Sequence, residues 1–221
     1  MKKLSLALLL LLIFSFKGFS QDDTRVQIGI SLGTSSPMGA FAKKDTNDYT
    51  NSGSAKTGFV FNSHIKLNLS KYCGLMFNGV LQVNGFSDYT DASGNTISHN
   101  TPWIVTSFLV GPYGIINVVK DEKFTINPKI MIGYADVYTP ELDINSSYGS
   151  NTLSVGRGLG FAYLAGLDFN FKIGSGFFLV ADVAYYHTLS NVGTEDDYGD
   201  VNYHANVSSI NTTLGIAYGF K

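Results

Sequence analysis

The stretch GFVFNSHIKLNL, residues 58–69, alternates large apolar side chains with polar ones. One set of alternate positions is almost wholly apolar, namely Phe59, Phe61, Ser63, Ile65, Leu67 and Leu69. Alternation with a period of two predicts a β-strand that has one apolar face and one polar face. In a soluble barrel the apolar face would point inward, whereas in a membrane barrel it would point to lipid. The rest of the sequence has to decide between these two cases.

The first twenty residues have the pattern of a secretory signal peptide. Lys2 and Lys3 precede the apolar run LSLALLLLLIFSF, and Gly18 and Ser20 place small residues before a cleavage site. The run is shorter than the roughly 20 residues that a membrane-spanning helix needs. We predict a signal peptide over residues 1–20 and one mature domain over residues 21–221.

Composition narrows the classes of function. The chain has 221 residues, of which 44% are hydrophobic and 14% are charged, and this charge is low for a soluble protein. Without the signal peptide, 17 acidic residues stand against 12 basic ones, and no basic patch suited to nucleic acid is visible. Cys73 is the single cysteine, which leaves no intramolecular disulfide and no cysteine cluster for a metal. We expect no cofactor, no metal and no nucleic-acid partner.

Eight strand-like segments can be read along the mature chain. They are expected at residues 25–36, 57–70, 73–87, 102–119, 123–137, 157–173, 176–189 and 207–221. The tight turns SKY (70–72), KDE (120–122) and GSG (174–176) alternate with long polar connections at residues 37–56, 88–101, 138–156 and 190–206. Short turns on one side and long loops on the other are typical of membrane barrels. We predict an all-β fold, an eight-stranded antiparallel up-and-down transmembrane β-barrel, with both termini on the short-turn, periplasmic side.

Two physical arguments direct the apolar face toward lipid. An eight-stranded barrel is just wide enough to be filled by side chains, so several large apolar residues per strand would overfill it. The opposite face is rich in Gly, Ala, Asn, Ser and Thr, and it also carries the charges of the strand interiors, where a soluble surface would need many more. The predicted polar cluster of the lumen consists of His64, Lys66, Lys129, Asp168, Lys172 and Asp182.

Aromatic residues gather near both ends of the predicted strands. Tyr72, Phe124, Tyr218 and Phe220 fall near the short turns, and Trp103, Tyr134, Tyr138 and Tyr185 fall near the long loops. Aromatic rings settle at the headgroup level of a bilayer, so we expect these residues to form two girdles on the outer surface.

With this layout the chain resembles the small outer-membrane β-barrel family, the eight-stranded group that includes the OmpX-, OmpW- and OmpA-membrane-domain-like proteins. The resemblance rests on the row of hairpins, on AYYHTLSNV (184–192) before an acidic loop, and on the closing LGIAYGF (214–220). It implies an outer-membrane location and contact with outer-membrane lipid. It also implies that Tyr218 and Phe220 form the signal read by the barrel-assembly machinery, although Lys221 follows the last aromatic residue.

One pattern in the sequence resembles the catalytic pair of a hydrolase. Some eight-stranded barrels deacylate lipid with a His-x-Ser pair, but His187 and Ser190 are three residues apart, which sends them to opposite faces of a strand. GRGLG (156–160) lacks the Lys-Ser/Thr end of a phosphate loop. We therefore predict no catalytic residues.

The predicted loop at residues 190–206 is acidic, with Glu195, Asp196, Asp197 and Asp200. The calcium-loop spacing with its distal Glu is absent, so we interpret these side chains as a solvated acidic surface. The expected function is that of a non-enzymatic outer-membrane protein of structural, adhesion or surface-interaction type, whose long loops contact an extracellular ligand or surface. The alternative is a narrow channel for small solutes, including apolar ones, and the remote alternative is a lipid-modifying hydrolase.

Overall fold

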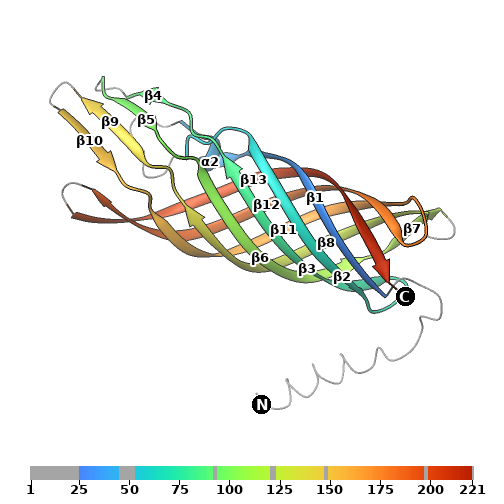
Figure 1. The fold of residues 1–221 in the computed structure, drawn as a ribbon. Helices are drawn as coiled ribbons and strands as arrows, with labels where there is room; N and C mark the ends of the chain where they lie inside the picture. Colours follow the sequence, from blue (N-terminus) through green and yellow to red (C-terminus); the bar gives the residue numbers. More distant parts are fainter. Residues whose placement is uncertain are drawn as a thin grey trace, which may run out of the picture.

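The computed structural model describes residues 25–44, 53–91, 94–119, 123–146, 149–196 and 199–220, and the predicted signal peptide and the KDE turn lie outside these ranges. Eight long strands build the body of the molecule (Figure 1). They are β1 (Val26–Pro37), β2 (Gly58–Asn68), β3 (Cys73–Asn84), β6 (Trp103–Gly114), β8 (Phe124–Tyr138), β11 (Arg157–Lys172), β12 (Phe177–Asp196) and β13 (Gly199–Phe220).

These strands close into a ring. Each pairs antiparallel with its neighbours in the order β1–β2–β3–β6–β8–β11–β12–β13, and β13 pairs with β1 from Val26↔Phe220 to Pro37↔Ser209. The ring has no free edge along its body, so the backbone groups of the wall bond to one another, as a strand in lipid requires. The eight-stranded antiparallel barrel predicted from the sequence is confirmed.

The β11–β12 connection is a tight turn that depends on a glycine and on one backbone hydrogen bond. Gly176 has φ of +84°, a conformation that glycine adopts without a steric penalty. The backbone N–H of Ile173 donates to the carbonyl of Phe177 over 2.9 Å, which closes the turn. We call this end of the barrel the turn end and the opposite end the loop end.

The loop end is more regular than the sequence predicted. Two connections expected to be loops, 88–101 and 138–156, form a second sheet in the order β10–β9–β5–β4. Its strands are β4 (Tyr89–Thr90), β5 (Thr96–His99), β9 (Leu142–Ser146) and β10 (Gly149–Leu153). Figure 1 shows this sheet extending beyond the barrel. The sequence predicted long polar connections here and did not predict that they pair as strands, which polar segments can do once the barrel holds their ends side by side.

Two smaller elements complete the chain. The expected strand 102–119 is interrupted at Ile115, and its continuation β7 (Ile116–Val119) still pairs with β8. The one-turn helix α2 (Gly39–Ala42) lies between β1 and β2.

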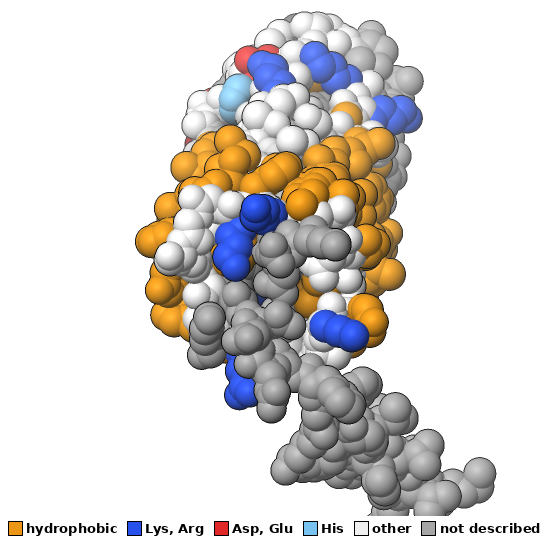
Figure 2. All heavy atoms as spheres, turned by 90° about the vertical axis from the view of Figure 1, so that its right-hand side faces the viewer, with side chains coloured by type: hydrophobic (Ala, Val, Ile, Leu, Met, Phe, Trp, Pro, Cys, Tyr) orange, Lys and Arg blue, Asp and Glu red, His pale blue; other side chains and the backbone are white. Residues whose placement is uncertain are grey.

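The outer surface carries an apolar belt. Its exposed side chains include Ile30, Leu32, Phe59, Phe77, Phe108, Ile130, Ile132, Phe161, Leu167, Val183, Leu214 and Ile216. Figure 2, which looks at the turn end, shows a band of hydrophobic side chains across this face, with polar and charged side chains on both sides of the band. In GFVFNSHIKLNL, Phe59 and Ile65 are exposed whereas His64 and Lys66 are buried, so the predicted direction of the two faces is confirmed. None of the helices in the described ranges has the length and hydropathy of a membrane span.

Candidate functional site

The lumen contains a cluster of buried charges toward the turn end. Lys129 Nζ lies 2.8 Å from Asp168 Oδ1 and 2.6 Å from Asp182 Oδ2, and Lys66 Nζ lies 2.9 Å from Asp168 Oδ2. Lys66 comes from β2 and the other three from β8, β11 and β12. The Lys66–Asp168 pair therefore crosses the barrel, whereas Lys129 pairs with residues of the adjacent strand and of the next one along the wall. The exposed fraction is 1% for Lys66 and 4% for Lys129. We call these four residues the charge cluster.

The charge cluster balances its own charge. Two ammonium groups meet two carboxylates, which is the condition under which charges can be buried without a large penalty. Lys66 also donates to Asn170 Oδ1 over 3.2 Å, and Asn170 donates to Asn127 Oδ1 over 3.2 Å. The cluster therefore continues into a network of side-chain amides.

The structure brings together most of the predicted polar residues of the lumen but not Lys172. His64 is buried beside the cluster and packs against Gly29, where an added Cβ would fall 2.5 Å from His64 Nε2. Lys172 is exposed at the end of β11. Its position follows the inward alternation, but the strand ends there, so the ammonium reaches water. Alternation along a strand predicts the face of a residue and not its depth in the barrel.

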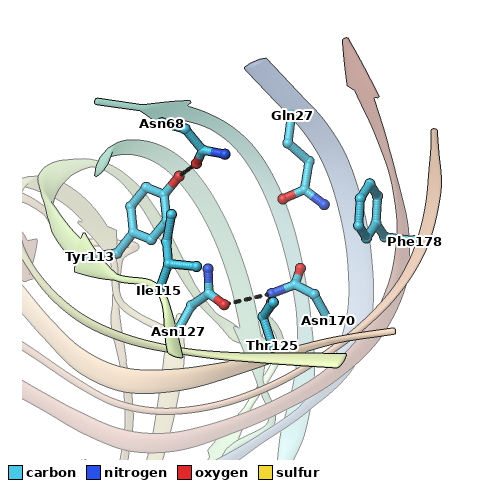
Figure 3. A pocket seen from close by; sticks show the side chains of 8 residues that line it. All are labelled: Gln27, Asn68, Tyr113, Ile115, Thr125, Asn127, Asn170 and Phe178. Carbon is cyan, nitrogen blue, oxygen red and sulfur yellow. Dashed lines mark hydrogen bonds between the residues drawn. The ribbon is translucent and has the colours of Figure 1, made fainter. Parts of the chain in front are cut away.

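Below the charge cluster, at the turn end, the lumen has a small hollow (Figure 3). Its volume is about 30 Å³, and it is lined by Gln27, Asn68, Tyr113, Ile115, Thr125, Asn127, Asn170 and Phe178. Tyr113 donates its hydroxyl to Asn68 Oδ1. The hollow has room for about one water molecule, so the charge cluster and its amides fill most of this half of the lumen.

The loop-end half of the lumen holds many apolar side chains together with uncharged polar ones. The polar side chains that hydrogen-bond to one another there include Ser35 with Asn84, and Gln82 with Ser209 and Asn211. The buried cluster contains Phe41, Val60, Val80, Trp103, Val105, Met131, Val137, Ala162, Leu164, Tyr186, Val192 and Val207, among others. Tyr186 satisfies its hydroxyl with Ser107 Oγ at 2.6 Å. The sequence predicted an inward face dominated by Gly, Ala, Asn, Ser and Thr, and the large inward rings of Trp103 and Tyr186 were not part of that prediction.

Residues 39–44 and 53–55, which belong to the connection between β1 and β2, fold into the loop-end mouth. The N–H of Gly53 donates to the carbonyl of Ala40, and that of Ala55 to the carbonyl of Phe41, each over 2.9 Å. Trp103 Nε1 donates to the carbonyl of Gly53 over 2.9 Å, and its ring meets Phe41 edge-on at 5.4 Å between centroids. We call residues 39–44 and 53–55, together with Trp103, the mouth plug.

Trp103 does not belong to the outer aromatic girdle in which the sequence analysis placed it. It is buried, with 6% of its surface exposed, whereas Tyr72 and Tyr134 of the predicted girdles are strongly exposed. The indole lies on the inward face because Trp103 shares its alternation with Val105 and Ser107. The alternation of the strand already indicates that Trp103 faces inward, but tryptophan at a strand end more often lies at the membrane–water interface.

The acidic residues of the predicted loop lie largely in strands. Glu195 and Asp196 belong to β12 and Asp200 to β13, with Glu195 paired to Asp200 in the register, while Asp197 lies outside the described residues. Glu195, Asp196 and Asp200 thus belong to the end of a long hairpin and not to a connecting loop.

His187 and Ser190 do not form a pair. Ser190 is buried in the lumen, whereas His187 lies on the outer face and its Nδ1 is 2.8 Å from Ser208 Oγ. The two residues point to opposite faces, as their spacing predicts. In the described ranges no group of three or more His, Cys, Asp or Glu side chains is placed to hold a metal ion.

Tyr218 and Phe220 of the predicted assembly signal lie on the outer face of β13. Both are exposed, and their rings meet edge-on at 4.8 Å. They therefore border the turn end of the belt on the strand that closes the barrel against β1.

No family model matches the sequence, and no curated protein matches it. Among solved structures, the attachment invasion locus protein Ail of Yersinia pestis is similar with 18% identity and a TM-score of 0.52, covering 90% of this chain and 100% of Ail. A major outer membrane protein from Thermus thermophilus is similar with 11% identity and a TM-score of 0.53, again covering 90% of this chain and 100% of that chain. Together with the closed ring and its apolar belt, these likenesses show that the chain has the fold of the small outer-membrane β-barrel proteins.

Proposed function

We propose that the chain is a non-enzymatic outer-membrane barrel with a closed lumen, whose loop end contacts an extracellular surface or ligand. The observation that carries this proposal is the second sheet, β4, β5, β9 and β10, which extends beyond the belt (Figure 1). A chain that needed only a membrane anchor would not require ordered strands outside the membrane. The fold is shared with Ail, which is named for attachment and invasion, and this is an analogy of fold alone.

The filled lumen supports this function over a channel. The mouth plug and the apolar cluster occupy the loop-end half, and the charge cluster crosses the turn-end half. A solute would have to displace both layers. The separation of His187 from Ser190 removes the pair that the sequence pattern suggested, and His187 Nδ1 instead lies 2.8 Å from Ser208 Oγ on the outer face.

The loop-end sheet has a stable framework on which contacts could be built. Asn100 donates to Glu141 Oε1 and to Asp143 Oδ2, each over 2.9 Å, and His99 Nδ1 lies 2.6 Å from Asp88 Oδ1. These bonds tie β5 to β9 and to the segment before β4. Several acids lie on or near this sheet, so basic or cationic surfaces are the favoured partners.

Removal of the sheet tests the proposal. Residues 88–100 and 140–155 would each be replaced by a short Gly-Ser turn, and the chain would be displayed on cells that lack other small barrels. We expect a folded barrel and a loss of cell retention on surfaces coated with basic protein. A matched variant in which Asp88, Asp91, Glu141 and Asp143 become Asn or Gln keeps the sheet and is expected to lower retention through charge alone. Unchanged retention in the deletion variant would contradict the proposal.

The orientation with both termini in the periplasm is part of the proposal and has its own test. Cys73 is the single cysteine and lies at the turn end, half-buried, and Thr90 is exposed at the loop end. In intact cells a membrane-impermeant maleimide should leave Cys73 unlabelled and should label the variant Thr90→Cys in a Cys73→Ser background. The reverse pattern would overturn the orientation.

A narrow passage is the second candidate, because some polar atoms of the lumen have no protein partner. The buried atoms without a hydrogen-bond partner in the protein include Asn62 Oδ1, His64 Nε2, both amide atoms of Asn78, and Gln82 Nε2. Water bound there would satisfy them, and such water is the first requirement of a polar path. Conductance of the purified barrel in planar bilayers separates the candidates: the closed barrel predicts none, and steps of single-channel current would favour the passage.

A further inference from the structure

The hollow at the turn end of the lumen is walled by polar side chains that are themselves buried. Gln27, Thr125, Asn127 and Asn170 line it, and each of them is more than nine-tenths buried. Asn68, which also lines the hollow, is the last residue of β2 and is only half-buried. The hollow therefore lies next to the solvent of the turn end, and a small solute can reach it from there.

The directions of two of these amides are fixed by the charge cluster. Lys66 Nζ donates to Asn170 Oδ1 over 3.2 Å, and Asn170 Nδ2 donates to Asn127 Oδ1 over 3.2 Å. An ammonium group can only donate, so the Asn170 atom that faces Lys66 is the oxygen, and the oxygen of Asn127 in turn faces Asn170. Figure 3 shows the Asn127 nitrogen pointing away from this bond, into the space that the lining residues enclose. We call Lys66, Asn170 and Asn127 the amide chain.

The amide chain carries positive charge toward the hollow. It begins at an ammonium group and ends at an N–H group, and hydrogen bonds aligned in this way polarise one another. The charge itself is also close, because Lys66 Nζ lies 5.8 Å from the centroid of the Tyr113 ring, which lines the hollow. A cation in the hollow would be repelled by both groups, whereas an acceptor with negative charge would be attracted.

Two further donors face the same space. Figure 3 shows the Gln27 amide across the hollow from Asn170, and neither this amide nor the Thr125 hydroxyl has a hydrogen bond to another lining residue. Both groups can donate a hydrogen bond to a bound acceptor. Together with Asn127, the hollow thus has donors from β1 and β8, on separate parts of the wall.

The size of the hollow decides the class of acceptor. Its volume of about 30 Å³ has room for about one water molecule. A carboxylate or a phosphate group has several heavy atoms and does not fit in this space, whereas a chloride or bromide ion consists of a single atom.

We propose that the hollow binds one halide ion from the turn end. Asn127, Gln27 and Thr125 donate to the ion, and Lys66 supplies the positive charge behind the amide chain. The charge cluster fills the lumen above the hollow, so the ion binds at a closed end and does not pass through. This site goes beyond the surface-contact function and does not depend on it.

The test uses the purified chain in detergent micelles with ¹⁵N labelling. Chloride, bromide and sulfate would each be titrated at an ionic strength kept constant with sodium gluconate, and NMR would follow the side-chain amide signals of Asn127 and Gln27. We expect both signals to shift and to saturate with chloride and with bromide. Sulfate should leave them in place, because it is too large for the hollow.

Asn127→Asp is the decisive variant. One carboxylate oxygen still accepts from Asn170, but the other replaces the N–H group with a negative charge, so chloride affinity read on the Gln27 signal should fall at least about tenfold. Asn191→Asp makes the same change of charge at an exposed position of β12 and should leave the affinity unchanged. Thr125→Val keeps the amide chain, removes one donor and should weaken binding about threefold.

The mobility shift of a folded barrel on unheated gels would confirm that each variant is folded, and Thr125→Val carries the test if Asn127→Asp does not fold. Equal shifts with chloride and sulfate, shifts that do not saturate, or an unchanged chloride affinity in the folded hollow variants would overturn the inference and would leave the hollow as a water site. None of these results bears on the surface-contact function, which is tested by cell retention and by cysteine labelling.

Discussion

The two halves of the lumen fill the same narrow space by different means. In the turn-end half, Lys66, Lys129, Asp168 and Asp182 are held by ion pairs of 2.6–2.9 Å. In the loop-end half, apolar residues and the mouth plug pack around Trp103 and Phe41, beside buried uncharged amides such as those of Gln82 and Asn84. Both halves are built from inward positions of the same strands, so the alternation of the wall does not determine the chemistry of its interior.

The turn-end half is stable only when all members of its ion-pair network are present, and the loop-end half is not limited in this way. An ion-pair network is stable only when every charge has a partner, because a lone charge in a dry lumen carries its full desolvation penalty. An apolar cluster loses stability in proportion to the atoms removed and the cavity left. Substitutions in the two halves should therefore differ in size and in whether a second change can restore stability.

The largest effect is expected for Lys129→Met. Lys129 contacts both carboxylates, so its loss leaves two negative charges with one remaining ammonium. We expect the free energy of unfolding to fall by about 3–5 kcal/mol, measured by urea unfolding in lipid vesicles with the fluorescence of Trp103, the single tryptophan.

Two further variants sharpen this result. Lys172→Met removes an exposed lysine of the same charge and should change the free energy of unfolding by less than about 0.5 kcal/mol. Lys129→Met combined with Asp182→Asn should recover part of the loss, because one unpaired carboxylate is removed. If both lysine variants were equally stable, the charge cluster would not hold the lumen together.

Trp103→Ala is expected to have the next largest effect. It removes a buried ring, its contact with Phe41 and its bond to Gly53, so the free energy of unfolding should fall by about 3 kcal/mol. Circular dichroism would follow unfolding, since no tryptophan remains. The purified variant should still show no conductance, because the charge cluster closes the other half. A conducting variant would show that the mouth plug alone closes the barrel.

Gly53→Ala tests the packing of the mouth plug more gently. An added Cβ would fall 2.5 Å from the carbonyl oxygen of Phe41, so the plug must shift. We expect a loss of about 1–3 kcal/mol and a red shift of Trp103 fluorescence as the indole meets water. Gly174→Ala, where no atom of the described residues lies within 4 Å of the new Cβ, is the control and should leave the fluorescence unchanged.

The smallest effect is expected for Tyr186→Phe. The change removes the bond to Ser107 Oγ and keeps the ring in the apolar cluster. The free energy of unfolding should fall by about 1 kcal/mol, as judged by the same urea titration. Adding Ser107→Ala should cost little more, because it removes the other partner of the same bond. A loss as large as that of Lys129→Met would remove the distinction between the two halves.

Much of the wall could be predicted from the sequence. The eight strands, their outward apolar face and the inward position of Lys66, Lys129, Asp168 and Asp182 follow from alternation and from the cost of charge in lipid. The pairing of these four could not be derived, because it depends on the depth at which each strand places its residue. The same reason explains why Lys172 was included with them although it lies at the rim.

The loop end shows where sequence reasoning stopped. The strands β4, β5, β9 and β10 have short, polar and turn-rich sequences, and such segments pair only when a larger framework holds their ends together. The burial of Phe41 likewise depends on a segment that folds back into the mouth. Neither the pairing of these strands nor the position of Phe41 leaves a local pattern, whereas the inward direction of Trp103 follows from the alternation of β6.

The sequence by itself determined the membrane barrel, because a period of two in hydrophobicity combined with few charges is compatible only with a wall between lipid and a narrow interior. Only the tertiary structure decided how that interior is filled and which residues meet across it. Those contacts join residues from different strands, and their distances are set by the register and closure of the barrel, which no single stretch of the chain encodes.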